Sequence, residues 1–561
     1  MKDLSNRPAM QYGGWLFCLA ALGFAGLAVV GTYQHYSPVP FWDMWNGYLE
    51  FYLRTGDEGW TPWWELHNEH RLVLPKAIFW LELHFLGGSL MALFVLNLLL
   101  ALGVFLGFGL IVRELIPQWR HNPAALMLLG LLGVLSFSWV QMENFTWAFQ
   151  SQFFLSYLVP LLAFGVLALA RTRASTGCFI LALVLGVASA GTMANGVLAL
   201  PLLTLLAAVL RMGWPRVLLL ALLAAAVITL YFTGYQTPVG HGSLLETLQT
   251  QPLELIEFVL LNLGAPLFFM ADGSSHLLPK LGGFFLIGSS AFFAWRLWQD
   301  GTAKPQQWAL LAFLLFVGGT ALATGGGRVL MGMDHALTSR YMTPVLMAWC
   351  ALLILYFSYL GTRFSDSLWT LGVFALVPAL LLPSQLTALE PPPHLYDRHV
   401  AGLALELGVA DAKYIDKVYF NIERALSIAD RARPLQLSVF GSPGIVGAHR
   451  RLGEMLAVLP QQSCLGSLDI VTPLGEAATF VRLQGWLYEP HLKQVPQTLL
   501  MLDPAGVVVG YALSGQARGD VAAVVAPQAA NSGFIGYLRT GVDSTSIRLV
   551  GQQPSCLYAV P

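Results

Sequence analysis

A carboxylate set among aromatic residues is the first candidate for chemistry in this sequence. Asp43 stands in the segment FWDMW, between Trp42 and Met44. Apolar neighbours raise the pKa of a carboxylate and make it a better proton acceptor near neutral pH. The segment therefore predicts a general base at Asp43. The alternative is a carboxylate within an interfacial belt of aromatic residues.

A cationic, hydrogen-bonding group follows in HNEHR. It contains His67, Glu69, His70 and Arg71, and Lys76 comes shortly after. Two histidines and one glutamate match no known zinc pattern, whereas arginine with a nearby lysine suits a phosphate. We expect Arg71 and Lys76 to bind phosphate and the other three to contact a sugar or an acceptor. No metal or cofactor is indicated, and a solvated interfacial turn is the alternative.

Planar amides and a carboxylate surround an aromatic ring in MENFTWAFQ, as is typical of sugar-binding sites. They are Glu143, Asn144, Gln150 and the ring of Trp147. Asn195, in GTMANG, lies near the end of an apolar hairpin, where a buried amide costs free energy unless it finds a partner. We expect all five to contact a sugar or an acceptor. Alternatively, these amides satisfy only the protein's own backbone.

The segment GGGRVLMGMDHALTSRYMTP supplies the remaining cations. Arg328 follows three glycines, which predict a mobile loop, and Arg340 stands beside Tyr341 at the start of an apolar run. Two arginines at a membrane surface suit a lipid phosphate, and interfacial anchoring is the alternative. We expect both arginines to bind the phosphate and Tyr341 to contact the sugar or acceptor.

The elements that must position these residues are membrane helices. The chain has 561 residues, of which 56% are hydrophobic and 11% charged, against about 25% charged in soluble domains. Repeated apolar runs predict a polytopic α-helical membrane protein. About eleven spans are expected, near residues 15–33, 88–112, 124–141, 154–170, 177–193, 197–210, 217–233, 281–298, 308–323, 344–361 and 368–386.

The distribution of cations predicts the orientation of these spans. Alternate loops are short and basic, as cytoplasmic loops are. The N-terminus is then cytoplasmic, and every candidate residue above lies in an outer loop or at an outer helix end. The cations of the predicted inner loops are Arg113, Arg120, Arg171, Arg173, Arg211, Arg216, Arg296, Lys304 and Arg363.

The sequence changes character near residue 387, which divides a membrane domain (1–386) from a C-terminal domain (387–561) on the outer side. Residues 395–460 read as helical and 461–561 as a small β-sandwich, with a DPAG turn at Asp503–Gly506 between alternating runs. Cys464 and Cys556 flank the β region. An outer, oxidising compartment permits a disulfide between them.

The predicted location of the candidate residues on the outer side of the membrane limits which sugar donors the protein could use. No nucleotide-activated donor is expected outside the cytoplasm, so a sugar would arrive on a polyprenyl phosphate. A phosphate leaving group, with a second pKa near 6, departs without a general acid. One carboxylate base and one or two arginines then suffice, whereas glycoside hydrolysis usually needs two facing carboxylates. Nucleic acid is not an expected partner, because the sequence has no basic face or nucleic-acid motif.

These features resemble the GT-C superfamily of polytopic glycosyltransferases that use lipid-linked sugars. The resemblance rests on FWDMW and HNEHR in a long first outer loop, on ENFTWAFQ, MANG and TSRYMTP at outer helix ends, and on the C-terminal domain; it covers about residues 1–390. It implies Asp43 as the base and Arg71, Arg328 and Arg340 as phosphate-binding residues. It also implies a bacterial inner membrane, a periplasmic C-terminal domain, and a periplasmic glycan or pilin-like protein as acceptor.

Three other functions stay open at this point. A lipid-linked oligosaccharide polymerase is hard to separate from a transferase by sequence. A transporter or flippase should show ionisable residues near the bilayer midplane and often internal repeats, and neither is evident. A scaffold or sensor would not need Asp43.

Overall fold

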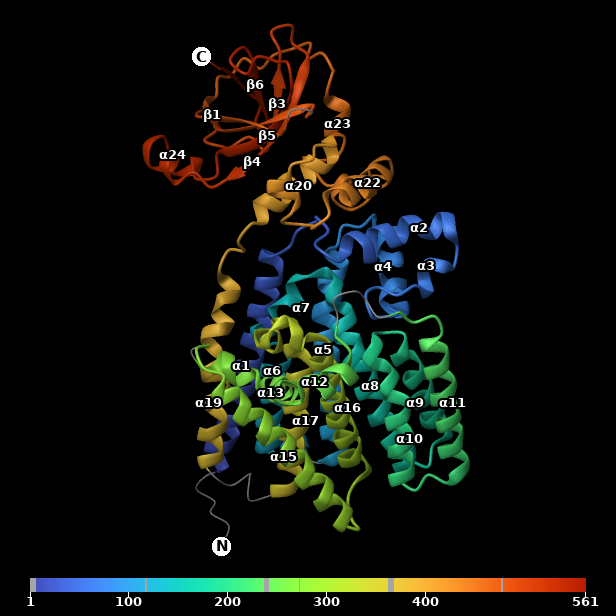
Figure 1. Ribbon diagram of the computed structural model, residues 1–561. Coiled ribbons are helices and arrows are strands. Elements are labelled where there is room, and N and C mark those ends of the chain that lie inside the picture. The colour runs from blue at the N-terminus through green and yellow to red at the C-terminus, as the bar shows by residue number, and fades with distance from the viewer. Residues whose placement is uncertain are drawn as a thin grey trace. The chain divides into compact units, whose positions relative to one another are not determined.

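The computed structural model describes residues 7–116, 119–236, 242–271, 273–361, 368–475 and 478–560, and Arg363 lies outside them. The chain forms two compact units that alternate along the sequence (Figure 1). The first comprises Met1–Tyr36, Trp63–Ala77 and Leu93–Pro391. The second comprises Ser37–Pro62, Ile78–Ala92 and Pro392–Pro561. The predicted division at residue 386 instead places the whole first outer loop with the membrane domain.

Apolar helices dominate the first unit, and the protein is a multi-pass membrane protein. In the described part of the chain, nine helices are long and apolar enough to cross a bilayer. Two shorter apolar helices, Thr176–Ala190 and Ala194–Val209, fall on the predicted spans at 177–193 and 197–210. Eleven crossings and their orientation remain predictions. The nine long helices are Gln11–Gln34, Met91–Leu115, Pro123–Thr146, Ala148–Thr172, Trp214–Phe232, Leu277–Gln299, Pro305–Met331, Ser339–Leu360 and Leu371–Leu389.

The first unit is built from long helices joined by short helical turns. In Figure 1, α8 to α11 lie side by side. The α-helices are α1 (Arg7–Gln34), α5 (Met91–Leu115), α6 (Pro123–Ser136), α7 (Met142–Thr146), α8 (Ser151–Thr172), α9 (Thr176–Ala190), α10 (Ala199–Val209), α11 (Trp214–Phe232), α12 (Leu244–Thr250), α13 (Pro252–Gly264), α14 (Pro266–Met270), α15 (Leu277–Gln299), α16 (Pro305–Arg328), α17 (Met342–Leu360) and α19 (Leu368–Leu386). The turns are η3 (Trp119–His121), η4 (Trp139–Gln141), η5 (Ala148–Gln150), η6 (Ala194–Leu198), η7 (Val329–Met331), η8 (Met333–Leu337), η9 (Ser339–Tyr341) and η10 (Thr387–Leu389).

Glycine permits the closest helix packing in this unit, as is common between membrane helices. A Cβ atom at Gly130 of α6 would lie 2.5 Å from the backbone carbon of Phe17 in α1. One at Gly264 of α13 would lie 1.8 Å from the carbonyl oxygen of Pro279 in α15. Any side chain at either position would push the two helices apart.

The second unit joins two stretches of the first loop to the C-terminal part of the chain. The loop stretches contain η2 (Trp45–Glu50), α2 (Phe51–Glu58), and parts of α3 (Thr61–Trp64) and α4 (Val73–Leu86). The C-terminal helices and turns are α20 (Leu395–Leu407), α21 (Ala412–Ile415), α22 (Ile422–Ala432), η11 (Arg433–Leu435), η12 (Ser438–Gly441), α23 (Ala448–Arg451), α24 (Gly519–Val524) and η13 (Pro527–Ala529).

A single seven-stranded antiparallel sheet follows, in the order β1-β2-β5-β4-β3-β6-β7. This differs from the predicted sandwich, because all seven strands pair side by side in one sheet. The DPAG turn joins β3 to β4 as predicted, and Asp503 Oδ1 accepts a hydrogen bond from the Val507 amide at 2.8 Å. The strands are β1 (Leu465–Pro473), β2 (Phe480–Tyr488), β3 (Thr498–Leu502), β4 (Val508–Gln516), β5 (Gly533–Arg539), β6 (Arg548–Gln552) and β7 (Cys556–Ala559).

The two edges of this sheet are tied to each other. The Cys464 amide donates to the Leu557 carbonyl at 2.9 Å, and the Leu557 amide donates to the Gln462 carbonyl at 2.8 Å. Cys464 and Cys556 form a disulfide, the pairing expected from the sequence. The residues before β1 thus pair with β7 through a parallel bridge between Ser463 and Leu557, which links the two edges at this point.

Candidate functional site

The HNEHR segment forms a tight turn in the first unit. His67 and His70 exchange backbone hydrogen bonds of 2.8 and 3.0 Å, and Asn68 between them has a φ of 52°. The His67 ring meets Phe149 edge-on, with ring centroids 5.2 Å apart. His70 Nδ1 accepts a hydrogen bond from the Ala194 amide at 3.3 Å, so a neutral His70 carries its proton on Nε2. The turn therefore contacts both η5 and η6.

Arg71 is held by backbone oxygens. Its side chain is buried, and three of its N–H groups donate to the carbonyls of Trp64, Tyr231 and Thr233, at 2.5, 2.8 and 2.7 Å. Its guanidinium also lies over the Trp64 ring, 4.7 Å from the centroid. These contacts occupy most of the hydrogen-bonding capacity that the predicted phosphate contact would use. Lys76 is similarly buried and donates to the Glu65 carbonyl at 2.8 Å.

Arg328 is paired with Glu69. The Arg328 guanidinium lies 3.0 Å from Glu69 Oε1, and His70 Nε2 lies 3.7 Å from the same oxygen. The predicted mobile loop at Gly325–Arg328 is wrong, because α16 continues to Arg328. A Cβ atom at Gly326 would lie 2.6 Å from the Cα atom of Leu244. The glycines thus allow α12 to pack closely against the end of α16.

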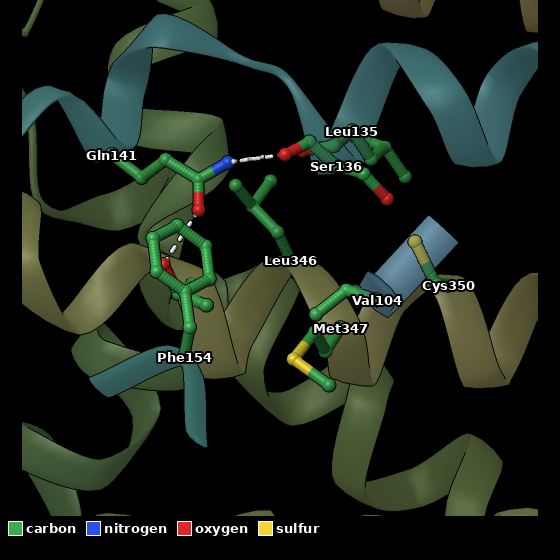
Figure 2. Close-up of a pocket in the computed structure, with 9 residues that line it drawn as sticks. Val104, Leu135, Ser136, Gln141, Phe154, Leu346, Met347 and Cys350 are labelled. Carbon is green, nitrogen blue, oxygen red and sulfur yellow. Dashed lines mark hydrogen bonds between the residues drawn. The ribbon is translucent and has the colours of Figure 1, made fainter. Parts of the chain in front are cut away.

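A chain of hydrogen bonds fixes the orientation of Asn144. Gln141 Nε2 donates to the Ser136 carbonyl at 2.9 Å (Figure 2), which leaves Gln141 Oε1 free to face Thr343. Thr343 Oγ1 donates to that oxygen at 2.5 Å, and Asn144 Nδ2 donates to Thr343 Oγ1 at 2.7 Å and to the Arg340 carbonyl at 2.8 Å. The amide nitrogen of Asn144 is fully used, and its Oδ1 accepts no hydrogen bond from the described residues.

Arg340 and Glu143 lie beside this amide. The Glu143 amide donates to Ser339 Oγ at 3.3 Å, and the Glu143 carboxylate interacts electrostatically with Arg340. The Arg340 guanidinium lies 5.6 Å from the centroid of the Tyr341 ring. Among the residues that the structure describes, it donates no hydrogen bond. We call Glu143, Asn144, Arg340 and Tyr341 the η9 cluster.

Further buried amides lie in η5 and η6. Gln150 Oε1 and both polar atoms of the Asn195 amide are buried and have no hydrogen-bond partner within the described ranges. Trp147 stacks on Phe149, with centroids 6.1 Å apart, and its carbonyl accepts from Asn97 Nδ2 at 3.1 Å. Buried polar atoms are rarely left unpaired in native proteins, so each such atom needs an explanation. Because these atoms are covered, a ligand would reach them only after the covering side chains move.

One cavity lies next to the hydrogen-bond chain, and it is too small for a sugar. Its volume is about 10 Å³, close to the space that one water molecule needs. Figure 2 shows Gln141 and Ser136 together with apolar lining side chains such as Leu346 and Val104. No predicted site residue lines it. The lining residues are Val104, Leu135, Ser136, Gln141, Phe154, Thr343, Leu346, Met347 and Cys350.

Asp43 belongs to the second unit. It precedes η2, and its carbonyl accepts a hydrogen bond from the Gly47 amide at 2.7 Å. Its aromatic neighbours Trp42 and Trp45 contact Phe420 and Tyr419 of the same unit. All the other predicted sugar- and phosphate-binding residues belong to the first unit, so neither unit by itself contains the complete predicted site.

Three polar residues that matter here were not predicted. Gln141 and Thr343 orient Asn144, and Tyr231 supplies an acceptor to Arg71. The sequence signal was slight: Gln141 stands just before MENFTWAFQ, Thr343 lies within TSRYMTP, and Tyr231 lies at the end of an apolar run. Within the described residues, no group of three or more His, Cys, Asp or Glu side chains is placed to hold a metal ion. No family model matches this sequence, and no curated protein matches it.

Proposed function

We propose that this protein is an inner-membrane glycosyltransferase that moves a sugar from a polyprenyl-phosphate donor to a periplasmic glycan or protein. The observation that carries the proposal is the η9 cluster. There, the fixed and buried Asn144 has an unpaired carbonyl oxygen next to Glu143, and its amide nitrogen bonds the carbonyl of Arg340, whose guanidinium donates no hydrogen bond to any described residue. A ligand would reach that oxygen only after the covering side chains move. A sugar diphosphate or monophosphate ester offers the complementary groups, namely hydroxyl donors and a phosphate acceptor.

The proposed reaction is a single displacement with inversion. The acceptor oxygen forms a bond to the anomeric carbon while the bond from that carbon to the phosphate oxygen breaks. The bonding electron pair leaves with the polyprenyl phosphate, and the acceptor proton passes to the base. Asp43 is the proposed base, assigned from the sequence. No general acid is required, because phosphate is a good leaving group.

The contacts refine the proposed roles of the three arginines. Arg340 is the best candidate for the phosphate, because its guanidinium donates no hydrogen bond within the described residues and interacts with the Glu143 carboxylate without forming a close ion pair. Arg328 is partly neutralised by Glu69, and Arg71 is committed to backbone carbonyls. We therefore expect Arg340 to contribute most to donor binding, with charge-assisted hydrogen bonds worth roughly 1.5–3 kcal/mol.

The test is sugar transfer by the purified full-length protein in vesicles, from a panel of labelled polyprenyl-phosphate sugars. Arg340→Ala should lower transfer about 10- to 100-fold, and Arg340→Lys should recover part of the loss. Asp43→Asn should lower it about 100-fold or more, as expected for removal of a general base. Arg113→Ala is the control, since Arg113 is an exposed residue in the last turn of α5.

Two outcomes would overturn the proposal. The first is normal transfer by both Arg340→Ala and Asp43→Asn, which would remove the site. The second is an inactive wild type with every donor on a broad panel. Donor movement across the bilayer without transfer would then favour a flippase, and chain growth of the lipid-linked glycan would favour a polymerase.

A further inference from the structure

The backbone next to Asp43 has an unusual conformation. Trp42 has a φ of 48°, in the left-handed region that bulky residues rarely occupy. Such residues cost free energy and persist only where their surroundings hold them, often near functional sites. Because φ and ψ at Trp42 set the direction of the following residue, whatever holds Trp42 also aims Asp43.

Residues 418–420 hold Trp42 within the second unit. The Trp42 amide donates a hydrogen bond to the Val418 carbonyl at 2.7 Å. The Trp42 ring stacks on Phe420, with centroids 6.2 Å apart and planes 29° apart. Trp45 is buried and packs against Tyr419, with ring centroids 6.4 Å apart. Asp43 itself interacts electrostatically with the Tyr419 hydroxyl. Both residues that flank Asp43 and Met44 are therefore fixed by one short C-terminal segment.

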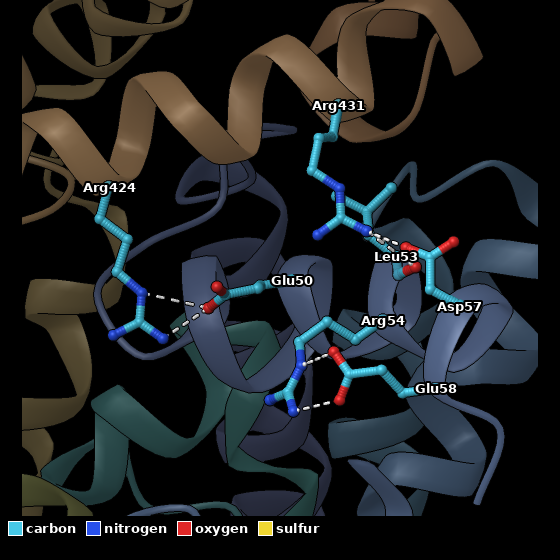
Figure 3. A network of polar contacts seen from close by, with 7 residues as sticks. All are labelled: Glu50, Leu53, Arg54, Asp57, Glu58, Arg424 and Arg431. Carbon is cyan, nitrogen blue, oxygen red and sulfur yellow. Dashed lines mark hydrogen bonds and ion pairs between the residues drawn. The ribbon is translucent and has the colours of Figure 1, made fainter. Parts of the chain in front are cut away.

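Two ion pairs add to this attachment (Figure 3). Arg424 Nη2 lies 2.6 Å from Glu50 Oε2, and Arg431 Nη2 lies 2.6 Å from Asp57 Oδ2. The two arginines stand seven residues apart, and so on one face of α22. Their partners lie in η2 and α2, directly after FWDMW. α22 begins just after residues 418–420, so this pairing sets the register in which that segment meets the loop.

We propose that residues 418–420 are positioning residues for Asp43, and that Phe420 is the one that acts mainly through Trp42. This rests on the proposed function, in which Asp43 is the base. The C-terminal part of the chain would then take part in the transfer step itself, in addition to any contact with the acceptor.

Phe420→Ala tests the proposal without disturbing a core, because 65% of the Phe420 surface is exposed. Loss of an aromatic stack of about 0.5–1.5 kcal/mol should raise hydrogen exchange of the amides at 42–47 about 2- to 10-fold. In the transfer assay, kcat should fall about 10- to 100-fold, because small misplacements of catalytic groups have effects of that size. KM for the donor should stay unchanged.

Phe420→Tyr keeps the ring, so its hydrogen exchange at 42–47 and its kcat should both match those of the wild type. Leu435→Ala, which shortens another exposed apolar side chain of the same unit, should change neither. Trp42→Gly against Trp42→Ala separates backbone strain from the ring: glycine removes the strain, and both variants lose the stack. Unchanged exchange in Phe420→Ala would overturn the proposal, as would an unchanged kcat in an active enzyme. Faster exchange in Phe420→Ala together with an inactive wild type would support the contact between Phe420 and Trp42 but contradict the proposed transferase function.

Discussion

The HNEHR turn and the FWDMW segment are both in the first predicted outer loop, yet different kinds of contact hold them in place. Arg71 of the turn is 4% exposed and donates to three backbone carbonyls in the first unit. FWDMW belongs to the second unit, where Met44 and Trp45 are buried, while a ring stack and one backbone hydrogen bond hold Trp42 and exposed ion pairs hold the helices that follow. Trp42 itself is 41% exposed. The first arrangement suits a rigid support. In the second, Met44 and Trp45 are anchored by burial, and the half-exposed Trp42 next to Asp43 is the part that can be adjusted.

Arg71→Ala should have the largest effect on stability. It removes a buried guanidinium and leaves the carbonyls of Trp64, Tyr231 and Thr233 without their donors, the one at Tyr231 in a buried place, so we expect a loss of about 3 kcal/mol. Thermal unfolding of the purified protein, followed by intrinsic fluorescence, measures it. Arg71→Lys should recover only part, because one ammonium group cannot reach three carbonyls. A change below about 0.5 kcal/mol would mean that the turn is no more rigid than FWDMW, and the comparison would fail.

Glu82→Gln should change how the stability of the second unit depends on pH. Glu82 is buried, accepts hydrogen bonds from Tyr48 and from the Leu90 amide, and has its pKa raised by burial. The folded state therefore holds the proton more tightly than the unfolded state, and the free energy of unfolding falls as pH rises through the raised pKa. Glutamine cannot titrate, so the variant should lack this fall.

Hydrogen exchange of residues 78–92 at several pH values reports the effect of Glu82 locally. Glu423→Gln is the control, since Glu423 is exposed and lies in the first turn of α22. An identical pH dependence in the wild type and in Glu82→Gln would show that Glu82 is not the group responsible.

Reversing the pair Glu50–Arg424 should give the smallest effect. Its side chains are 21% and 47% exposed, and such pairs contribute about 0.2–1 kcal/mol. Glu50→Arg alone should loosen FWDMW slightly, and adding Arg424→Glu should restore it. Exchange of the amides at 42–47 in the two single variants and the double variant gives the coupling. Additive effects would mean that this pair does not help to hold the segment.

The sequence could predict what depends on composition and local pattern. Long apolar runs predicted the helices of the first unit, and the DPAG turn predicted the β3–β4 hairpin. It could not predict the partners of Arg71, because these are carbonyls whose residue types carry no signal. It could not assign residues 37–62 to the second unit either, since Glu50 and Arg424 are 374 residues apart. The predicted loop at Gly325–Arg328 failed because buried glycine favours close packing there over flexibility.

That separation also sets an order of events during synthesis. Glu50 has to wait for Arg424, 374 residues later, before it can meet its partner. At roughly 5–20 residues per second, this wait lasts about 20 to 75 s. For that time Trp42 and Trp45 lack their C-terminal ring partners, Phe420 and Tyr419, while the apolar helices that lie between residues 50 and 424 in the sequence are being made. The second unit can therefore fold completely only after the membrane helices have been synthesised. Its C-terminal part, which is synthesised last, then packs against a segment near the N-terminus.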